Sequence, residues 1–290
     1  MNDLIIIITA SLVAMSCSLL GCFLILRQMA MLADAISHAV LPGIVIAYLF
    51  SGSRESILLL PGAALSGVLA TYLIEAIHRK ARIHADASIG VVFTWMFALG
   101  VVLISLFAGQ TDLDQDCVLY GEIAYTPLDL WITNSGFNLG PRQIWLLSIL
   151  FLAVFFFVKL GMKGLSITAF DASFAAITGV NVIAWHYALM GMVSITTVFS
   201  FESVGAILVV AMFTAPPATA YLLTDKLKTM ILLSIVFAIT SSISGYYLAW
   251  HFNSSVSGAI AVAAGIQFSF AFALSLYKKN ILNRKQAKQI

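Results

Sequence analysis

Residues 27–43, RQMAMLADAISHAVLPG, are the stretch from which the fold and the function of this chain are best understood. They place Asp34 and His38 four residues apart at the head of an apolar run that continues to Phe50. On a helix, this spacing puts both side chains on one face. A carboxylate and an imidazole are costly inside a hydrocarbon layer and commonly mark a functional site there. Together they offer one oxygen and one nitrogen ligand, which suits divalent manganese, iron or zinc.

The same pair also has a purely structural interpretation, in which Asp34 caps the helix and His38 is hydrogen-bonded in the bundle interior. Pro42 and Gly43 follow directly. Proline removes a backbone donor and kinks a helix, which frees carbonyl groups for another partner. We therefore expect a helix kink at Pro42-Gly43. An interrupted helix beside two ionisable side chains is typical of an ion path through a transporter.

The composition identifies an integral membrane protein. Of the 290 residues, 61% are hydrophobic and 10% are charged, whereas soluble chains carry about 25% charged residues. Most of the chain falls into apolar runs close to the roughly 20 residues that a helix needs to cross a bilayer. The predicted spans are 4–26, 34–50, 57–77, 87–107, 142–160, 181–199, 203–222, 230–251 and 256–276. This predicts an all-α polytopic bundle of about nine transmembrane helices, with eight as the alternative because the second span is short and polar.

The positive charges predict the orientation of the bundle. With the N-terminus outside, 13 of the 15 Lys and Arg residues fall in or beside cytoplasmic loops. Cytoplasmic loops are normally enriched in these residues, so we expect an N-out, C-in topology. The prediction is a single transmembrane domain over 1–276, followed by a basic cytoplasmic tail over 277–290.

Two connections between the predicted spans are long. The outer one, 108–141, contains Asp112, Asp114 and Asp116, but it lacks the glycine and glutamate of a calcium hand. The inner one, 161–180, predicts a short amphipathic surface helix with the following signals: Asp171 as N-cap, Phe174 and Ile177 on one face, and Gly179 as terminator. Such a helix either packs on lipid headgroups or docks a cytoplasmic partner.

Two further features of the late spans allow a structural or a functional interpretation. Glu202 is predicted to open the span 203–222 near the outer face, where it either complements the helix dipole or completes a cation route. Pro216 and Pro217 predict a kink packed against another helix. The chain has no His-Glu-x-x-His sequence and no P-loop sequence, so it lacks the signatures of a zinc protease and of a P-loop ATPase.

The chain resembles the membrane permeases of bacterial ABC importers for manganese, zinc and iron over nearly its whole length. Five stretches carry this resemblance: LADAISHAVLPG (32–43), FDASFAAITG (170–179), VGAILVVAM (204–212), AYLLTD (220–225), and the outer-loop pair DLD (112–114) and LYG (119–121).

The resemblance implies the vitamin-B12-type ABC importer architecture in a bacterial plasma membrane. It implies a second permease subunit, identical or related, two cytoplasmic ATPase subunits that bind ATP, and an extracytoplasmic metal-binding protein. Membrane lipid surrounds the bundle, and no nucleic acid is involved. The chain itself is then a transport subunit and not an enzyme.

The resemblance also implies roles for individual residues. Asp34 and His38 match the family's acidic and histidine positions in the pathway for the transported manganese, zinc or iron, and Glu202 is a further candidate ligand. Residues 169–179 match the family's coupling helix. Within it the candidate ATPase-docking residues are Phe170, Asp171, Phe174, Ala175 and Gly179.

The leading hypothesis is therefore the permease subunit of an ATP-dependent importer of divalent transition metals. An ATP-independent, ion-coupled secondary transporter with the same ligands is the main alternative, and it would be supported by an inverted repeat. An intramembrane metalloenzyme would need more ligands and a general base than the sequence offers.

Overall fold

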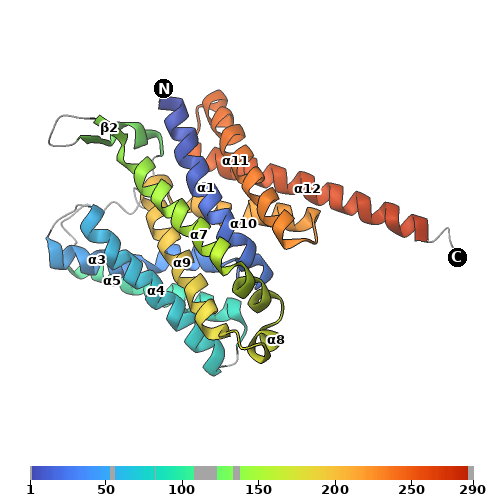
Figure 1. The fold of residues 1–290 in the computed structure, drawn as a ribbon. Helices are drawn as coiled ribbons and strands as arrows, with labels where there is room; N and C mark the ends of the chain where they lie inside the picture. The colour runs from blue at the N-terminus through green and yellow to red at the C-terminus, as the bar shows by residue number, and fades with distance from the viewer. Residues whose placement is uncertain (1, 53–55, 82, 108–122, 133–137, 287–290) are drawn as a thin grey trace.

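The computed structural model describes the chain except residues 1, 53–55, 82, 108–122, 133–137 and 287–290. The described part is almost entirely helical (Figure 1). Its α-helices are α1 (Asn2–Leu26), α2 (Leu32–Ala39), α3 (Leu41–Ser51), α4 (Ser56–Ala81), α5 (Ala85–Phe107), α7 (Arg142–Phe170), α8 (Ala172–Ile177), α9 (Val182–Val204), α10 (Ala206–Leu223), α11 (Leu227–Phe252) and α12 (Val256–Gln286). A 3-10 helix, η1 (Ile123–Leu128), precedes a small antiparallel pair, β1 (Leu130–Ile132) and β2 (Asn138–Pro141).

Nine segments of the described chain are long and apolar enough to cross a membrane, which confirms the predicted count of nine. The second of these segments, Leu32–Ser51, consists of α2 and α3 together. Helix α8 lies at one end of the bundle, and the N-terminus and β2 lie at the other (Figure 1). Which of these ends faces the cytoplasm stays a prediction.

The fifth span is longer than the sequence suggested. Helix α7 continues to Phe170, so the prediction of a connection starting at residue 161 was wrong. Gly161 and Gly164 do not end the helix, because they are the places where Trp185 of α9 packs against it. An added Cβ would lie 2.6 Å from the Trp185 ring at Gly161 and 2.3 Å at Gly164.

Two other boundaries also differ from the predicted ones. Helix α12 continues to Gln286, so most of the predicted tail 277–290 is helical. The predicted outer connection, 108–141, contains η1, β1 and β2, which ends at Pro141. The acidic residues Asp112, Asp114 and Asp116 lie outside the described residues.

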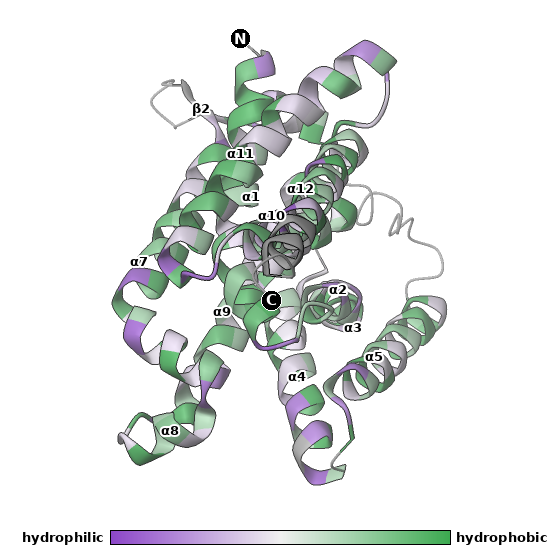
Figure 2. Cartoon of the chain, turned by 90° about the vertical axis from the view of Figure 1, so that its right-hand side faces the viewer, coloured by the Kyte–Doolittle hydropathy of each residue, from purple (hydrophilic) through white to green (hydrophobic). Residues whose placement is uncertain are grey.

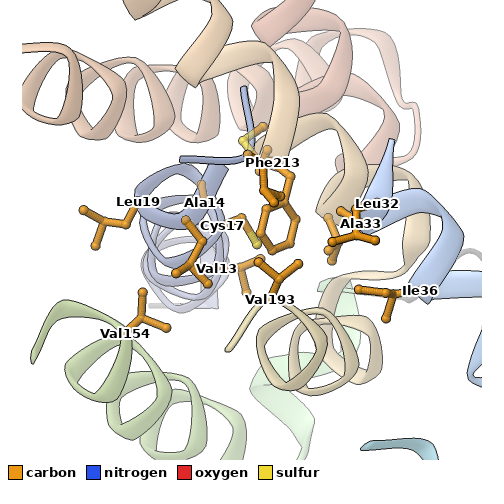
Figure 3. Packing of buried hydrophobic residues seen from close by; sticks show 14 of the residues in the cluster. Val13, Ala14, Cys17, Leu19, Leu32, Ala33, Ile36, Val154, Val193 and Phe213 are labelled. Atoms are coloured by element: carbon orange, nitrogen blue, oxygen red, sulfur yellow. The ribbon is translucent and has the colours of Figure 1, made fainter. Parts of the chain in front are cut away.

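The core is built by residues of α1, α9, α10 and α2, with the α9 and α10 side chains lying between those of α1 and α2 (Figure 3). Cys17 of α1, Phe213 of α10 and Val193 of α9 are fully buried there. Ile36 enters from α2, and it is also fully buried. This packing places α2, which carries Asp34 and His38, against the centre of the bundle.

Glycines allow two pairs of helices to approach closely. A Cβ added at Gly21 of α1 would lie 2.2 Å from the Phe213 carbonyl oxygen of α10. A Cβ added at Gly43 of α3 would lie 2.3 Å from the Gly62 carbonyl oxygen of α4. Small residues at such points let membrane helices pack backbone to backbone.

The outer surface of the helices is mostly apolar, and the polar residues concentrate toward the helix ends and loops (Figure 2). Leu65, Trp95 and Phe270 are examples of large hydrophobic side chains that are more than half exposed. This distribution is the one that a chain surrounded by lipid requires, because lipid tails are as apolar as the side chains themselves.

Candidate functional site

Asp34 and His38 lie on the same face of α2. His38 Nε2 is 3.8 Å from Asp34 Oδ1, so the two side chains can turn toward one ion. The Asp34 side chain is 47% exposed and that of His38 is 26% exposed. The ligand pair therefore lies at the surface of this single chain, while the opposite face of α2 carries the buried Ile36.

Two aromatic rings of α5 hold the His38 imidazole. Its ring centroid is 5.2 Å from that of Phe93 and 5.7 Å from that of Phe97, with the second contact edge-on. Aromatic contacts of this kind fix the orientation of a ring. Neither Phe93 nor Phe97 was predicted to lie at the site. Their four-residue spacing was visible, but no local pattern shows that α5 packs against α2.

Among the residues that the structure describes, no third ligand completes a metal site with the pair. The described residues contain no group of three or more His, Cys, Asp or Glu side chains that could hold one ion. A protein-bound zinc ion usually has four ligands, and a catalytic one has three from the protein. One oxygen and one nitrogen are therefore suited to brief coordination in a path, or to a site completed by another chain.

A break in the second span follows the pair. Helix α2 ends at Ala39 and α3 begins at Leu41, so the interruption lies at Val40, two residues before Pro42. Pro42 has no N–H to donate to the carbonyl four residues earlier, which is that of His38. Ser66 Oγ of α4 donates a hydrogen bond of 2.7 Å to the Ala39 carbonyl and so fixes the break.

The other residues predicted to kink a helix take different places. Gly43 lies in α3 and faces Gly62 of α4, where it allows close packing. Helix α10 runs through both Pro216 and Pro217 without a break, and both prolines are buried. The Pro217 ring lies beside Gly21 of α1, since a Cβ there would be 2.8 Å from Pro217 Cγ.

Glu202 is in the last turn of α9, not at the start of α10, so the prediction that it opens a span was wrong. Gly205, with φ of 77°, is the residue that separates the two helices. The side chain of Glu202 is outside the described part of the chain. A Cβ added at Gly67 of α4 would contact both Ser194 of α9 and Ile36 of α2, so these two residues lie at the same level of the bundle. Glu202 is eight residues beyond Ser194 in α9, which corresponds to about 12 Å along the helix.

Helix α8 has well-defined ends. The Asp171 carboxylate accepts hydrogen bonds of 2.9 Å from the backbone N–H groups of Ser173 and Phe174, which confirms Asp171 as N-cap. At the other end, Gly179 has φ of 80° and donates to the Ala176 carbonyl. Val180 donates to the Ala175 carbonyl, which completes the Schellman pattern.

The outward face of α8 is apolar. Phe174 is 55% exposed and Ile177 is 85% exposed, and Phe170, just before the helix, is also exposed. Ala175 is fully buried and seats the helix on the bundle. An open groove of about 700 Å³ runs between α8 and the start of α11, and its lining includes Phe170, Phe174 and Lys226.

Residues 4–276 match the ABC 3 transport family. The chain belongs to this family. It is 45% identical to the manganese transport system membrane protein MntD of Bacillus subtilis, over 93% of this chain and 91% of the relative. It is 38% identical to the zinc transport system membrane protein TroD of Treponema pallidum, over 93% and 73%. A solved structure, PsaBC from Streptococcus pneumoniae in complex with Fab, superimposes with a TM-score of 0.74 at 32% identity, covering 92% of this chain and 90% of that one.

Membership of the ABC 3 transport family confirms the resemblance on which the sequence analysis relied. It also confirms the polytopic helical fold and places the chain in a membrane as a multi-pass protein. For an ABC 3 family member, two features of the structure are candidates for function: the Asp34–His38 pair on α2, and the exposed apolar face of α8.

Proposed function

We infer that this chain is the permease subunit of an ABC importer for divalent transition metal ions. The ion path is inferred from the placement of Asp34 and His38 on one face of α2, where their side chains are 3.8 Å apart and partly exposed. This donor pair accepts manganese, iron(II) or zinc. It is also weak enough to release an ion, which conduction requires.

The partner chains are part of the same proposal. A second permease subunit facing α2 would supply further ligands to an ion held by Asp34 and His38, because the described part of this chain brings only these two together. Cytoplasmic ATPase subunits would dock on the exposed side chains of Phe170, the last residue of α7, and of Phe174 and Ile177 in α8. An extracytoplasmic protein would deliver the metal at the opposite end of the bundle. ATP-driven import is favoured over the ion-coupled secondary transporter because residues 4–276 match the ABC 3 transport family.

Metal uptake into vesicles tests the proposal. The complex of this chain with its ATPase and binding protein is reconstituted with radioactive manganese or zinc, with and without ATP. We expect ATP-dependent uptake that is lost in Asp34→Asn, which replaces the charged carboxylate by a weaker neutral amide oxygen, and in His38→Ala, which removes the imidazole ligand.

The matched controls are Asp129→Asn and His251→Ala, which change the same residue types at exposed positions away from α2. They should transport like the unchanged chain. Uptake that persists in both α2 variants would show that the pair serves packing only. Uptake that is indifferent to ATP would favour the secondary transporter.

A further inference from the structure

A network of largely buried polar side chains connects the end of α1 with α4, α7 and α9, at the end of the bundle that carries α8. Arg27, the first residue after α1, donates from Nη2 to Thr168 Oγ1 of α7 over 2.7 Å. Its Nη1 lies 3.1 Å from Nδ1 of His186 in α9. The other ring nitrogen of His186, Nε2, lies 2.8 Å from Oε2 of Glu75 in α4. The Glu75 side chain is 6% exposed and that of His186 is 13% exposed.

The chemistry of the four groups fixes where the protons are. Arginine can only donate, so Nδ1 of His186 must accept from Arg27. Nε2 of His186 then carries the hydrogen and donates a hydrogen bond to the Glu75 carboxylate. Burial lowers the pKa of the Arg27 guanidinium, and the negative charge of Glu75 acts to raise it. A neutral imidazole thus bridges one positive and one negative charge, and each charge balances the other.

The network holds both chain segments that flank α8. Thr168 is four residues before the first residue of α8, Ala172, and His186 is in the second turn of α9, which follows α8. Next to His186, Trp185 packs against the α7 backbone at Gly161 and Gly164. Contacts therefore connect the end of α7 with the start of α9, on the two sides of α8.

On its other side, the network leads to the candidate metal ligands by two routes. Arg27 continues through a turn at Gln28, with φ of 58°, into α2, where Asp34 is seven residues further on. Glu75 lies in α4, and Ser66 of the same helix hydrogen-bonds the Ala39 carbonyl at the end of α2. A displacement of α8 and its flanking segments would therefore act on α2 through both connections.

We propose that Arg27, His186 and Glu75 are positioning residues that transmit a displacement of α8 to α2 and so link ATP hydrolysis on a partner to movement of the metal ligands. This inference rests on the proposed function, since it assigns a route between the two sites named there. Energetic coupling between separate sites needs a continuous element that both sites bias. This network is our candidate for such an element, because it contacts the flanks of α8 directly and reaches α2 through the turn at Gln28 and through α4.

The test measures metal uptake and ATP hydrolysis together in proteoliposomes that contain the whole complex. Arg27→Gln removes the positive charge and the forked donor. The double variant Arg27→Gln with Glu75→Gln removes both charges and leaves the site neutral, so it controls for an unbalanced buried charge. Arg142→Gln is the matched arginine control, at the start of α7 and far along that helix from Thr168.

We expect both network variants to hydrolyse ATP while the number of metal ions transported per ATP falls about ten-fold, within the range by which single residues alter coupling. Arg142→Gln should keep the ratio of the unchanged complex. If the double variant restores the ratio, the network only balances charge and the proposal is overturned. An unchanged ratio in Arg27→Gln overturns it equally. A complex of the unchanged chain that shows no ATP-dependent uptake overturns the proposed function itself, which is a separate result.

Discussion

Replacing Gly21 by alanine tests whether the approach of α1 to α10 is as close as the structure shows. The new Cβ would lie 2.2 Å from the Phe213 carbonyl oxygen and 2.8 Å from Pro217 Cγ. Ordinary van der Waals contact begins at 3.4 Å, so the first distance is about 1.2 Å too short. The obstructing atom belongs to the backbone, and it cannot turn away as a flexible side chain would.

The expected cost follows from this geometry. Extra volume in a packed interior destabilises a protein by about 1–3 kcal/mol, because the helices must move apart. At about 2–4 °C for each kcal/mol, which is the scale for chains of 150–250 residues, the melting temperature should fall by about 2–12 °C. The measurement is thermal unfolding of the purified chain in detergent.

Gly191→Ala is the matched control. Gly191 is inside α9, and a Cβ added there would meet no atom within 4 Å. Alanine is about 0.5–1 kcal/mol better than glycine inside a helix, so this variant should melt at the original temperature or slightly above it. Equal melting temperatures for Gly21→Ala and Gly191→Ala would refute the argument from close packing.

Two further predictions concern α8 and the metal pair. Asp171→Ala removes the N-cap of α8 at a cost of about 1 kcal/mol; we expect about five-fold weaker binding of the ATPase subunits, measured by titration in detergent. Asp171→Asn keeps a capping oxygen and should bind normally, so equal weakening of both variants would contradict the capping argument. Acidification should reduce metal uptake, because protons compete with the metal for the imidazole of His38 and the carboxylate of Asp34. Uptake and ATP hydrolysis are followed in parallel across a pH series, and a constant ratio of the two would count against this pair as ligands.

The spans and the caps could be predicted because they depend on local sequence. Hydropathy over about 20 residues identifies a membrane helix regardless of its neighbours. The carboxylate of Asp171 caps α8 through bonds within three residues, so its role was visible from the sequence alone. Family resemblance suggested the role that we propose for Asp34 and His38, which their spacing alone left open.

The contacts between helices could not be predicted from one sequence. Glycine often ends a helix, so Gly161 and Gly164 suggested that the fifth span stops there. Only the position of Trp185 explains why α7 continues through them. Glu75 is the single charged residue of the predicted span 57–77, which is a signal for a functional site. Its partner His186 is 111 residues away in the chain, and no local pattern links the two.

The two capped ends of α8 have a consequence for the speed and cost of assembly. An isolated six-residue helix is not stable in water, because nucleating a helix is unfavourable. Here Asp171 and the Gly179 turn hold the helix in shape before any partner arrives. A docking surface that is already ordered loses little conformational entropy on binding. If a partner docks on Phe174 and Ile177 as proposed, it meets a surface that is already ordered, so its association includes no folding step.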